Sequence, residues 1–191
     1  MDMTALEVSG MIRLQNPAAL DLQGQGVLIG FVDTGINYEH PAFRNVDGST
    51  RILGIWDQTQ MEGPPPNGMS YGAFYGEEEI NAALQAEQPQ SIVPERDESG
   101  HGTFLAGVAG GSADAGAEFS GAAPLAQIAV VKCKQAKQYL RDYYFIPDGA
   151  ECYQENDLML GLAWLNRFAY ERQLPLVVCI GMGGSLGNHT G

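Results

Sequence analysis

The stretch Gly26-Val27-Leu28-Ile29-Gly30-Phe31-Val32, followed by Asp33-Thr34-Gly35, decides the fold. Its apolar run at residues 27–32 is typical of a strand that is buried on both faces of a parallel sheet. Similar apolar runs occupy residues 51–56, 127–132 and 175–180, and helical patterns lie between several of them. This alternation predicts an α/β fold with a parallel sheet and crossover helices on both faces.

Two helices are indicated by their side-chain patterns. Residues 102–110 carry small side chains at close spacing, which suits a helix packed tightly against the sheet. A second helix is expected to begin at Asp157, a good N-cap residue. Its apolar face is predicted to contain Leu158, Leu162, Leu165 and Ala169.

Two long excursions interrupt the alternation, and we expect both to be surface insertions in one domain that spans residues 1–191. The first, residues 57–97, is rich in Gly, Pro, Gln and Glu and includes a short predicted helix at residues 77–86. The second, residues 134–156, interleaves charged residues with four tyrosines. Packing on the sheet edge explains these tyrosines better than ligand binding does: Tyr139, Tyr143, Tyr144 and Tyr153.

Composition narrows the classes of partner. The chain has 191 residues, of which 45% are hydrophobic, enough for one core. Its net charge of −13 argues against nucleic acid and anionic membranes as partners. No signal peptide or membrane span is predicted. The three cysteines lack the spacing of a disulfide framework or a zinc site, which favours a reducing, intracellular location.

The chemistry is expected at the carboxyl ends of the strands, where open α/β sheets bind ligands. Asp33 follows its strand directly, and His101 lies between two glycines at the start of the helix over residues 102–110. Across the strand ends the carboxylate could accept the Nδ1 proton of the imidazole and stabilise the charge formed when Nε2 takes a proton from a serine. Taken singly, each residue would more often be structural.

The motifs Val32-Asp33-Thr34-Gly35-Ile36, His40-Pro41, Gly100-His101-Gly102-Thr103 and Gly121-Ala122-Ala123-Pro124 occur here in the order and spacing of the subtilase family, which the chain resembles over residues 14–191. The resemblance implies a subtilisin-like serine endopeptidase. It also implies that Asp33 is the orienting acid and His101 the general base. Residues 1–191 would then be the amino-terminal part of one catalytic domain.

Residues 47–53, 55–58 and 187–191 are similar, more narrowly, to clostridial subtilases that include the Csp germination proteases. This similarity implies a proenzyme of spore germination in an intracellular or spore-associated location.

The family resemblance also implies a peptide-binding site. The loop Gly181-Met182-Gly183-Gly184 would line the substrate's P1 side and pair with its extended chain, although Gly181 stands where the family commonly has serine. Residues 150–153, which include Cys152, would form the opposing edge strand. A peptide would then be held by β-augmentation between the two segments.

The family's nucleophile is absent from this sequence. Neither a G-T-S-x-A motif nor the A-A-G-N-like strand end that supplies the oxyanion-hole asparagine occurs in residues 1–191. We therefore expect the chain alone to be inactive. An alternative is a pseudoprotease or regulatory scaffold with the subtilase fold.

Other possibilities are weaker. Gly24, Gly26 and Gly30 resemble a nucleotide-binding pattern, but they precede and enter a strand rather than follow one. His40 and His189 lack a second ligand at metal spacing, so we expect turn-stabilising roles and no metal site. No cofactor is predicted. The family resemblance allows a structural calcium ion, but the sequence shows no carboxylate-rich loop with the alternating ligands that would assign a site.

The family resemblance implies that the four apolar runs lie side by side in the sheet in the order 51–56, 127–132, 27–32 and 175–180. The last run would be an open edge. We therefore expect self-association of the chain, or coverage of this edge by the missing carboxyl-terminal part of the domain.

Overall fold

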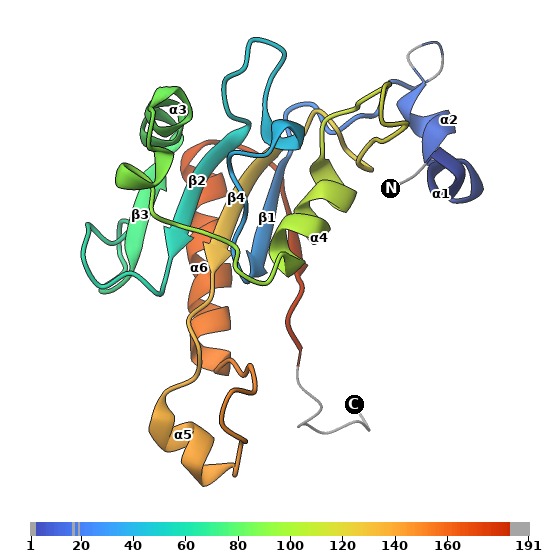
Figure 1. The fold of residues 1–191 in the computed structure, drawn as a ribbon. Helices are drawn as coiled ribbons and strands as arrows, with labels where there is room; N and C mark the ends of the chain where they lie inside the picture. Colours follow the sequence, from blue (N-terminus) through green and yellow to red (C-terminus); the bar gives the residue numbers. More distant parts are fainter. Residues whose placement is uncertain (1–2, 17, 19, 184–191) are drawn as a thin grey trace.

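One sheet of five strands organises the molecule in the computed structural model, which describes residues 3–16, 18 and 20–183 (Figure 1). The strand order is β3-β2-β4-β1-β5, with β3 antiparallel and the other strands parallel. The strands are β1 (Leu28–Asp33), β2 (Ile52–Asp57), β3 (Ala73–Gly76), β4 (Gln127–Lys132) and β5 (Leu176–Ile180). The order of the four predicted strands is confirmed, whereas β3 was not expected.

The helical elements are distributed along the whole chain. Among the described residues, two short helices precede the first strand, and two 3-10 turns and four further helices lie between the strands. Their bounds are α1 (Met3–Val8), α2 (Met11–Gln15), η1 (Pro41–Phe43), α3 (Glu77–Gln85), η2 (Pro89–Ser91), α4 (His101–Gly110), α5 (Gln138–Tyr143) and α6 (Glu155–Glu171). None of the helices in the described part of the chain is both long and apolar enough to cross a membrane.

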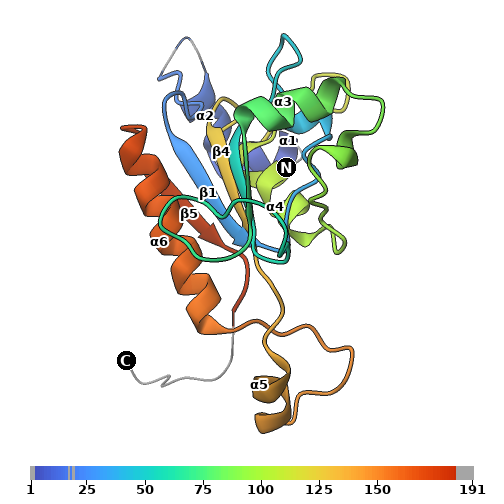
Figure 2. The ribbon, with the colours of Figure 1, turned by 90° about the vertical axis from the view of Figure 1, so that its left-hand side faces the viewer.

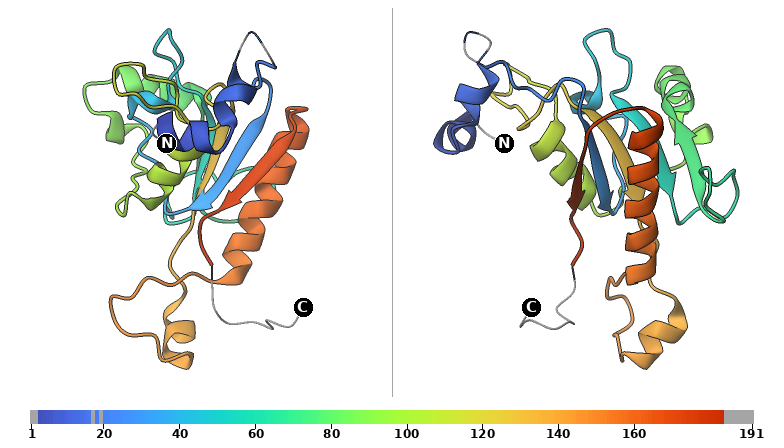
Figure 3. Two further views of the ribbon diagram at one scale, coloured as in Figure 1. Left: turned by 90° about the vertical axis from the view of Figure 1, so that its right-hand side faces the viewer. Right: turned by 180° about the vertical axis from the view of Figure 1, so that it is seen from behind.

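Helices cover both faces of the sheet, as predicted (Figures 2 and 3). On one face, Phe31 of β1 packs in a buried cluster with Ile80 of α3 and Ala106 of α4. On the other face, Val32 of β1 packs in a cluster with Leu165 of α6. Successive residues of β1 thus serve opposite cores, which explains why the sequence of this strand is apolar throughout.

The register of the sheet aligns the polar residues that end the strands. Asp33 at the end of β1 lies opposite Lys132 of β4, and Lys132 in turn lies opposite Asp57 of β2. Both aspartates are fully buried. Charged groups are therefore concentrated at the carboxyl edge of an otherwise apolar sheet.

The predicted start of the long helix was wrong. Helix α6 begins at Glu155 with Gln154 at the N-cap, and Asp157 lies inside its first turn, 2% exposed. Leu162 is also not on the buried face, because 41% of its surface is exposed. Gly161, Trp164 and Phe168 are buried in α6 as well.

Asp157 is buried because it ties three segments together. Its Oδ1 accepts hydrogen bonds from Nζ of Lys134 at 2.5 Å and from the hydroxyl of Tyr71 at 2.6 Å. Its carbonyl accepts from Nε2 of Gln58 at 3.0 Å. A buried carboxylate needs such partners, so this residue fixes both excursions to α6 instead of capping the helix.

The two excursions differ in their relation to the core. Residues 57–97 add β3 to the sheet and bury Ile80 and Val93, so this segment is part of the core rather than a surface loop alone. Residues 134–156 contain α5, which extends beyond the carboxyl ends of the strands (Figure 1). Here the expected tyrosine packing was wrong for three of the four residues: Tyr139, Tyr143 and Tyr144 are 63%, 72% and 56% exposed.

Candidate active site at the strand ends

The side chain of Asp33 is held at the end of β1 by hydrogen bonds to one of its two oxygens. Oδ1 accepts from the backbone N–H of Thr34 at 2.7 Å and lies 2.8 Å from Nδ1 of His101. Oδ2 is buried and has no hydrogen-bond partner among the described residues. The imidazole of His101 is thus the side chain that best compensates this buried carboxylate.

His101 is the first residue of α4, and 49% of its side chain is exposed. Because an ionised carboxylate only accepts hydrogen bonds, Nδ1 carries the proton and Nε2 is the basic nitrogen. The hydrogen bond to Asp33 and the charge of Asp33 raise the pKa of His101, and the charges of Asp97 and Glu151 raise it further. The predicted meeting of Asp33 and His101 is therefore present in the geometry.

Thr34 joins the strand end to the helix start. Its hydroxyl donates to Oδ1 of Asp97 at 2.7 Å and accepts from the backbone N–H of Gly102 at 3.0 Å. One side chain, next to Asp33 in sequence, thereby fixes the first turn of α4. The position of His101 depends on this link as well as on its own bond to Asp33.

Asp97 is a site residue that the sequence reasoning missed. Its Oδ2 accepts from the backbone N–H and the hydroxyl of Thr103 at 2.8 and 2.6 Å, and its Oδ1 accepts from the N–H of Gly100 at 2.9 Å. Burial raises the pKa of Asp97, but the hydrogen bonds from Thr103, Thr34 and Gly100 outweigh burial and lower it. A carboxylate a few residues before a helix start was the available signal.

Two glycines allow close packing around Asp33. A Cβ atom at Gly102 would collide with the carbonyl of Gly35 and would lie 3.1 Å from Oδ1 of Asp33. A Cβ atom at Gly181 would collide with Oδ2 of Asp33 and with Leu105. The departure of Gly181 from the serine common in the family therefore has a steric reason in this chain.

The predicted substrate loop follows β5. Its first residue, Gly181, donates its N–H to the carbonyl of Val32 at 3.3 Å, which holds the loop beside Asp33. Met182 packs against the core cluster on the α6 face, and Gly183 is exposed. Gly184 and His189 lie outside the described residues.

The second predicted substrate segment is not a strand. Residues 150–153 have no regular secondary structure, and both backbone groups of Cys152 are used within the molecule. Its N–H donates to Oε1 of Gln135 at 2.9 Å, and its carbonyl accepts from the N–H of Ala136 at 2.8 Å. The prediction of a strand over residues 150–153 was therefore wrong. Both backbone groups of Cys152 already have partners within the protein, so neither is free to pair with a peptide.

A second buried carboxyl group lies next to the site. Glu95 is 1% exposed, and its Oε1 accepts from the backbone N–H of Ile36 at 3.1 Å. Oε2 has no partner among the described residues. Burial raises the pKa of Glu95 to about 8, although Ile36 and Lys132 act in the opposite direction. Sequence reasoning had not singled out this residue.

The remaining candidates have local roles. Nδ1 of His40 accepts from the N–H of Ala42 at 3.1 Å and caps η1, the turn-stabilising role that we expected. All three cysteines are free, and burial raises the pKa of the Cys133 thiol to about 12. Within the described residues, no three His, Cys, Asp or Glu side chains form a group that could hold a metal ion.

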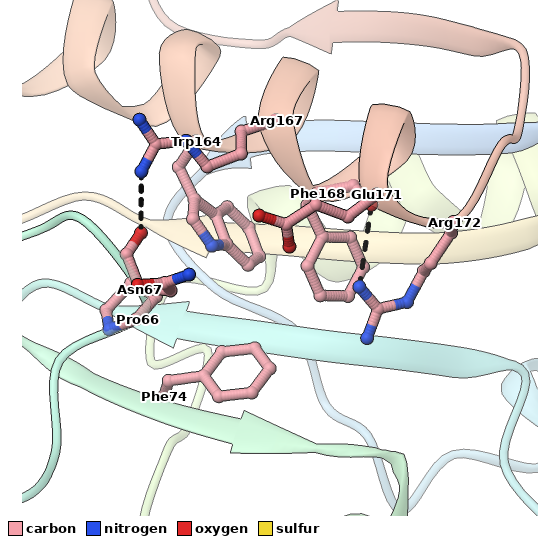
Figure 4. Close-up of a pocket in the computed structure, with 8 residues that line it drawn as sticks. All are labelled: Pro66, Asn67, Phe74, Trp164, Arg167, Phe168, Glu171 and Arg172. Atoms are coloured by element: carbon pink, nitrogen blue, oxygen red, sulfur yellow. Dashed lines mark hydrogen bonds between the residues drawn. The ribbon is translucent and has the colours of Figure 1, made fainter.

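Two hollows lie apart from Asp33 and His101. A groove of about 1570 Å³ runs between η1 and the outer face of α4, where Phe104 is 67% exposed. A smaller hollow of about 130 Å³ lies on the α6 side (Figure 4). In it, Arg172 stacks on the ring of Phe168, and Arg167 donates to the carbonyl of Asn67, so both cations have partners within the protein.

Comparison with known proteins agrees with this geometry. The Peptidase S8 model, which describes the subtilase family, matches residues 24–146. The chain belongs to the subtilase family. The matched residues of this subtilase include β1, the whole of α4 and β4, and therefore both Asp33 and His101.

Two named relatives are similar to this subtilase over part of its length. Subtilisin-like protease SBT2.4 of Arabidopsis thaliana is 31% identical over 127 residues, which are 57% of this chain and 15% of the relative. Thermitase of Thermoactinomyces vulgaris is 27% identical over 124 residues, which are 64% of this chain and 32% of the relative. The subtilase chain thus spans about a third or less of the length of these relatives.

A solved structure extends the similarity to nearly the whole chain. The CspB protease of Clostridium perfringens matches with a TM-score of 0.80 and 34% identity over 98% of this chain and 35% of its own. This match confirms both the subtilisin-like fold and the narrower resemblance to Csp-type proteases. The chain corresponds to about a third of CspB. The match therefore does not by itself establish the activity, substrates or partners of the whole protein, which we treat below as proposals.

Proposed function

We propose that residues 1–191 supply the acid–base half of a subtilisin-type serine endopeptidase, with Asp33 as the orienting carboxylate and His101 as the general base. The observation that carries this proposal is the 2.8 Å contact between Oδ1 of Asp33 and Nδ1 of His101 at the carboxyl edge of the sheet. The exposure of the imidazole supports it, because a general base must reach the reacting hydroxyl.

The proposed chemistry uses the two ring nitrogens in turn. Nδ1–H donates to Asp33, so Nε2 is free to take the proton of a serine hydroxyl while its oxygen attacks the peptide carbonyl. The buried Asp33 stabilises the imidazolium that results, and Nε2 then gives the proton to the departing amine. Asp97 and Thr34 would act through position, because they fix the start of α4.

The serine in this proposal comes from sequence outside residues 1–191. The chain contains no G-T-S-x-A motif, so we propose that it does not hydrolyse peptides by itself. An orienting carboxylate and a base without a nucleophile and an oxyanion hole give little acyl transfer.

We place the substrate peptide between the loop that begins at Gly181 and the segment 150–153. The backbone groups of Glu151 and Tyr153 form no hydrogen bond with any described residue, whereas those of Cys152 are used. In an extended segment, residues 151 and 153 present their N–H and C=O groups to the side opposite to those of residue 152. We therefore assign the pairing to Glu151 and Tyr153 in place of Cys152.

The test is covalent labelling of the natural polypeptide that contains this sequence. A fluorophosphonate probe, which reacts with activated serines, should label that polypeptide, and it should not label the 191-residue chain. His101→Ala should abolish the labelling, whereas His40→Gln, a change to the other described histidine, should preserve it. Labelling that survives His101→Ala would refute the assigned base.

A regulatory scaffold is the second candidate, because the chain contains two residues of the triad and nothing of the third. The two candidates differ in which residue occupies the position of the motif serine further along the natural polypeptide. Serine in a G-T-S-x-A context favours the protease, and any other residue favours the scaffold.

The similarity to a Csp protease supports a proposal about context. We propose a role in spore germination, with an intracellular or spore-associated location and a protein or peptide as the substrate. Deletion of the gene should slow germination of otherwise normal spores, and germination at the normal rate would contradict this role.

We also propose that the open edge of the sheet takes part in association. Within the described sheet, β5 is an edge strand with Val177 and Ile180 57% and 49% exposed. Unpaired backbone groups beside apolar side chains favour pairing with another strand.

A further inference from the structure

The segment of residues 93–97 is fastened to both ends of the turn that follows β1, residues 34–38. At one end of the turn, the hydroxyl of Thr34 donates to Oδ1 of Asp97 at 2.7 Å. At the other end, the hydroxyl of Tyr38 donates to the carbonyl of the segment's first residue at 2.8 Å. The turn and the segment therefore hold one another in place.

The carboxyl group of Glu95 lies between these two attachments and contacts the middle of the turn. Its Oε1 accepts from the backbone N–H of Ile36 at 3.1 Å. Gly35 packs so closely on this oxygen that a Cβ atom at Gly35 would collide with it, and the same Cβ atom would lie 3.3 Å from the side chain of Lys132. The turn therefore rests directly on the carboxyl group of Glu95.

The turn connects this contact to the helix that begins with His101. A Cβ atom at Gly102, the next residue, would collide with the carbonyl of Gly35 and would lie 3.1 Å from Oδ1 of Asp33. Gly35 is thus in close contact with Glu95 and with the first turn of α4. Closely packed atoms leave no space to absorb a displacement, so a shift of Glu95 would be passed on to Asp33 and His101.

The surroundings of Glu95 favour its neutral form. The residue is 1% exposed, and in the part of the chain that the structure describes its Oε2 has no hydrogen-bond partner. A charge buried with a single hydrogen bond costs far more free energy than a neutral carboxyl group in the same place. The ammonium of Lys132 does not pair with Glu95, because it donates to the carbonyl of Arg96 at 2.5 Å. The charges of Asp57 and Asp97 also oppose ionisation.

Loss of the proton would create a buried carboxylate that needs a cation. The titratable and charged groups around Glu95 come from three strands, the turn and its own segment: Lys132 of β4, Asp57 of β2, Tyr75 of β3, Tyr38, Arg96 and Asp97. Of these groups, Lys132 and Arg96 are cations, and Arg96 is exposed. To pair with the new charge, Lys132 has to leave the carbonyl of Arg96, which loosens the segment beside Asp97.

We propose that Glu95 is a positioning residue, which holds the turn of residues 34–38 in place while it carries a proton and releases the turn when the proton is lost to solvent. Release of the turn weakens the pairing of Asp33 with His101 and slows the reaction at alkaline pH. This inference rests on the proposed function, and it adds a regulation of the same site by pH.

The rate of labelling by a fluorophosphonate probe tests the effect on the site, in the natural polypeptide that contains residues 1–191. Between pH 8 and pH 9.5 the rate should fall about tenfold, as expected when one group with a pKa of about 8 must stay protonated. Glu95→Gln should remove this fall, because an amide keeps the acceptor for Ile36 and cannot ionise. Glu98→Gln, a change to an exposed carboxylate that does not shift the pKa of Glu95, should leave the fall unchanged.

Lys132→Met is a second test, which leaves the carboxyl group itself intact. The charge of Lys132 lowers the pKa of Glu95, so its removal should move the fall in the labelling rate to higher pH. A pH profile that is identical in the native protein and in Glu95→Gln overturns the inference, as does a native rate that does not fall up to pH 9.5.

The backbone amide of Ile36 reports on the same proton without any reaction. In the natural polypeptide labelled with ¹⁵N-isoleucine, the NMR signal of Ile36 should shift with a midpoint near pH 8, because its N–H donates to the group that ionises. Glu95→Gln should abolish this shift. If the probe labels the polypeptide at no pH, the protease proposal fails, and the Ile36 signal alone then decides whether Glu95 controls the turn. A signal that does not shift overturns that control.

Discussion

The α-carbon of Gly181 lies so close to Oδ2 of Asp33 that the structure has no room for a methyl group there. The loop after β5 and the orienting carboxylate are therefore sterically coupled. Gly181→Ala should displace either the carboxylate of Asp33 or the loop, and we expect a loss of about 1–3 kcal/mol in the free energy of unfolding. Denaturant titration of the 191-residue chain measures this loss.

Gly183→Ala is the control for this experiment. Apart from its chain neighbours, no atom of the described residues lies within 4 Å of a Cβ atom built at Gly183, and its φ is not in the left-handed region. The free energy of unfolding should change by less than about 0.5 kcal/mol. Equal destabilisation by both substitutions would contradict the close approach at Gly181.

The proton equilibrium of His101 gives a second prediction. Asp33 raises the pKa of His101 above its usual 6.5, so the neutral imidazole that a general base requires should form only at a higher pH. Asp33→Asn should lower this pKa, which NMR titration of the ring protons can follow. In the active polypeptide, the acid limb of the rate profile should move to lower pH, while the rate falls about 10⁴-fold.

The raised pKa of His101 also makes the free energy of unfolding depend on pH. A histidine with a raised pKa in the folded state stabilises the protein fully below the pKa of the unfolded chain, and this contribution is lost as pH rises through the folded value. The effect should be modest because the ring is half exposed. A pKa of His101 below 6.5 in the native chain would contradict the upward shift that the hydrogen bond to Asp33 produces.

Glu95 should make stability fall as pH rises. Its pKa is raised from the usual 4.5 to about 8 in the folded protein, so between these values the folded state binds more protons than the unfolded chain. The free energy of unfolding should therefore decrease from pH 5 to pH 8. Glu95→Gln, which mimics the protonated form, should reduce this slope. A slope that is identical in both proteins would show that Glu95 is not protonated in the folded state.

The edge strand β5 predicts association of the 191-residue chain. Light scattering should show a mass that grows with concentration, because Val177 and Ile180 are exposed on a strand that pairs on one side only within the described sheet. Val177→Lys should shift the mass toward the monomer without changing the circular dichroism spectrum. A monodisperse monomer for the unsubstituted chain would refute this proposal.

The elements that could be predicted are those with a regular pattern of apolar or small residues in their own sequence. The four parallel strands are continuous apolar runs, and α4 follows from its glycines and small residues. Strand β3 was missed because it has only four residues, in a segment of loop-like composition. Its formation depends on pairing with β2, a contact that no local pattern encodes.

Within the site, Asp33 and His101 were predictable from their positions after a strand and before a helix. Asp97 was not, because its role depends on hydrogen bonds to Thr34 and Thr103 that form only after folding. Asp157 was misread as a cap for the same reason, since its partner Lys134 comes from another segment. Local preferences were overridden where a buried charge required a distant partner.

The hydrogen bonds around Asp33 have a consequence for how such chains diverge. A buried carboxylate that loses its imidazole partner destabilises the fold, and Thr34 and Asp97 hold the start of α4 in the same network. Selection for stability alone would preserve this pair of residues after the reaction was lost. The acid and the base of the proposed triad therefore contribute to the stability of the fold as well as to the proposed reaction, whereas the nucleophile would serve the reaction alone.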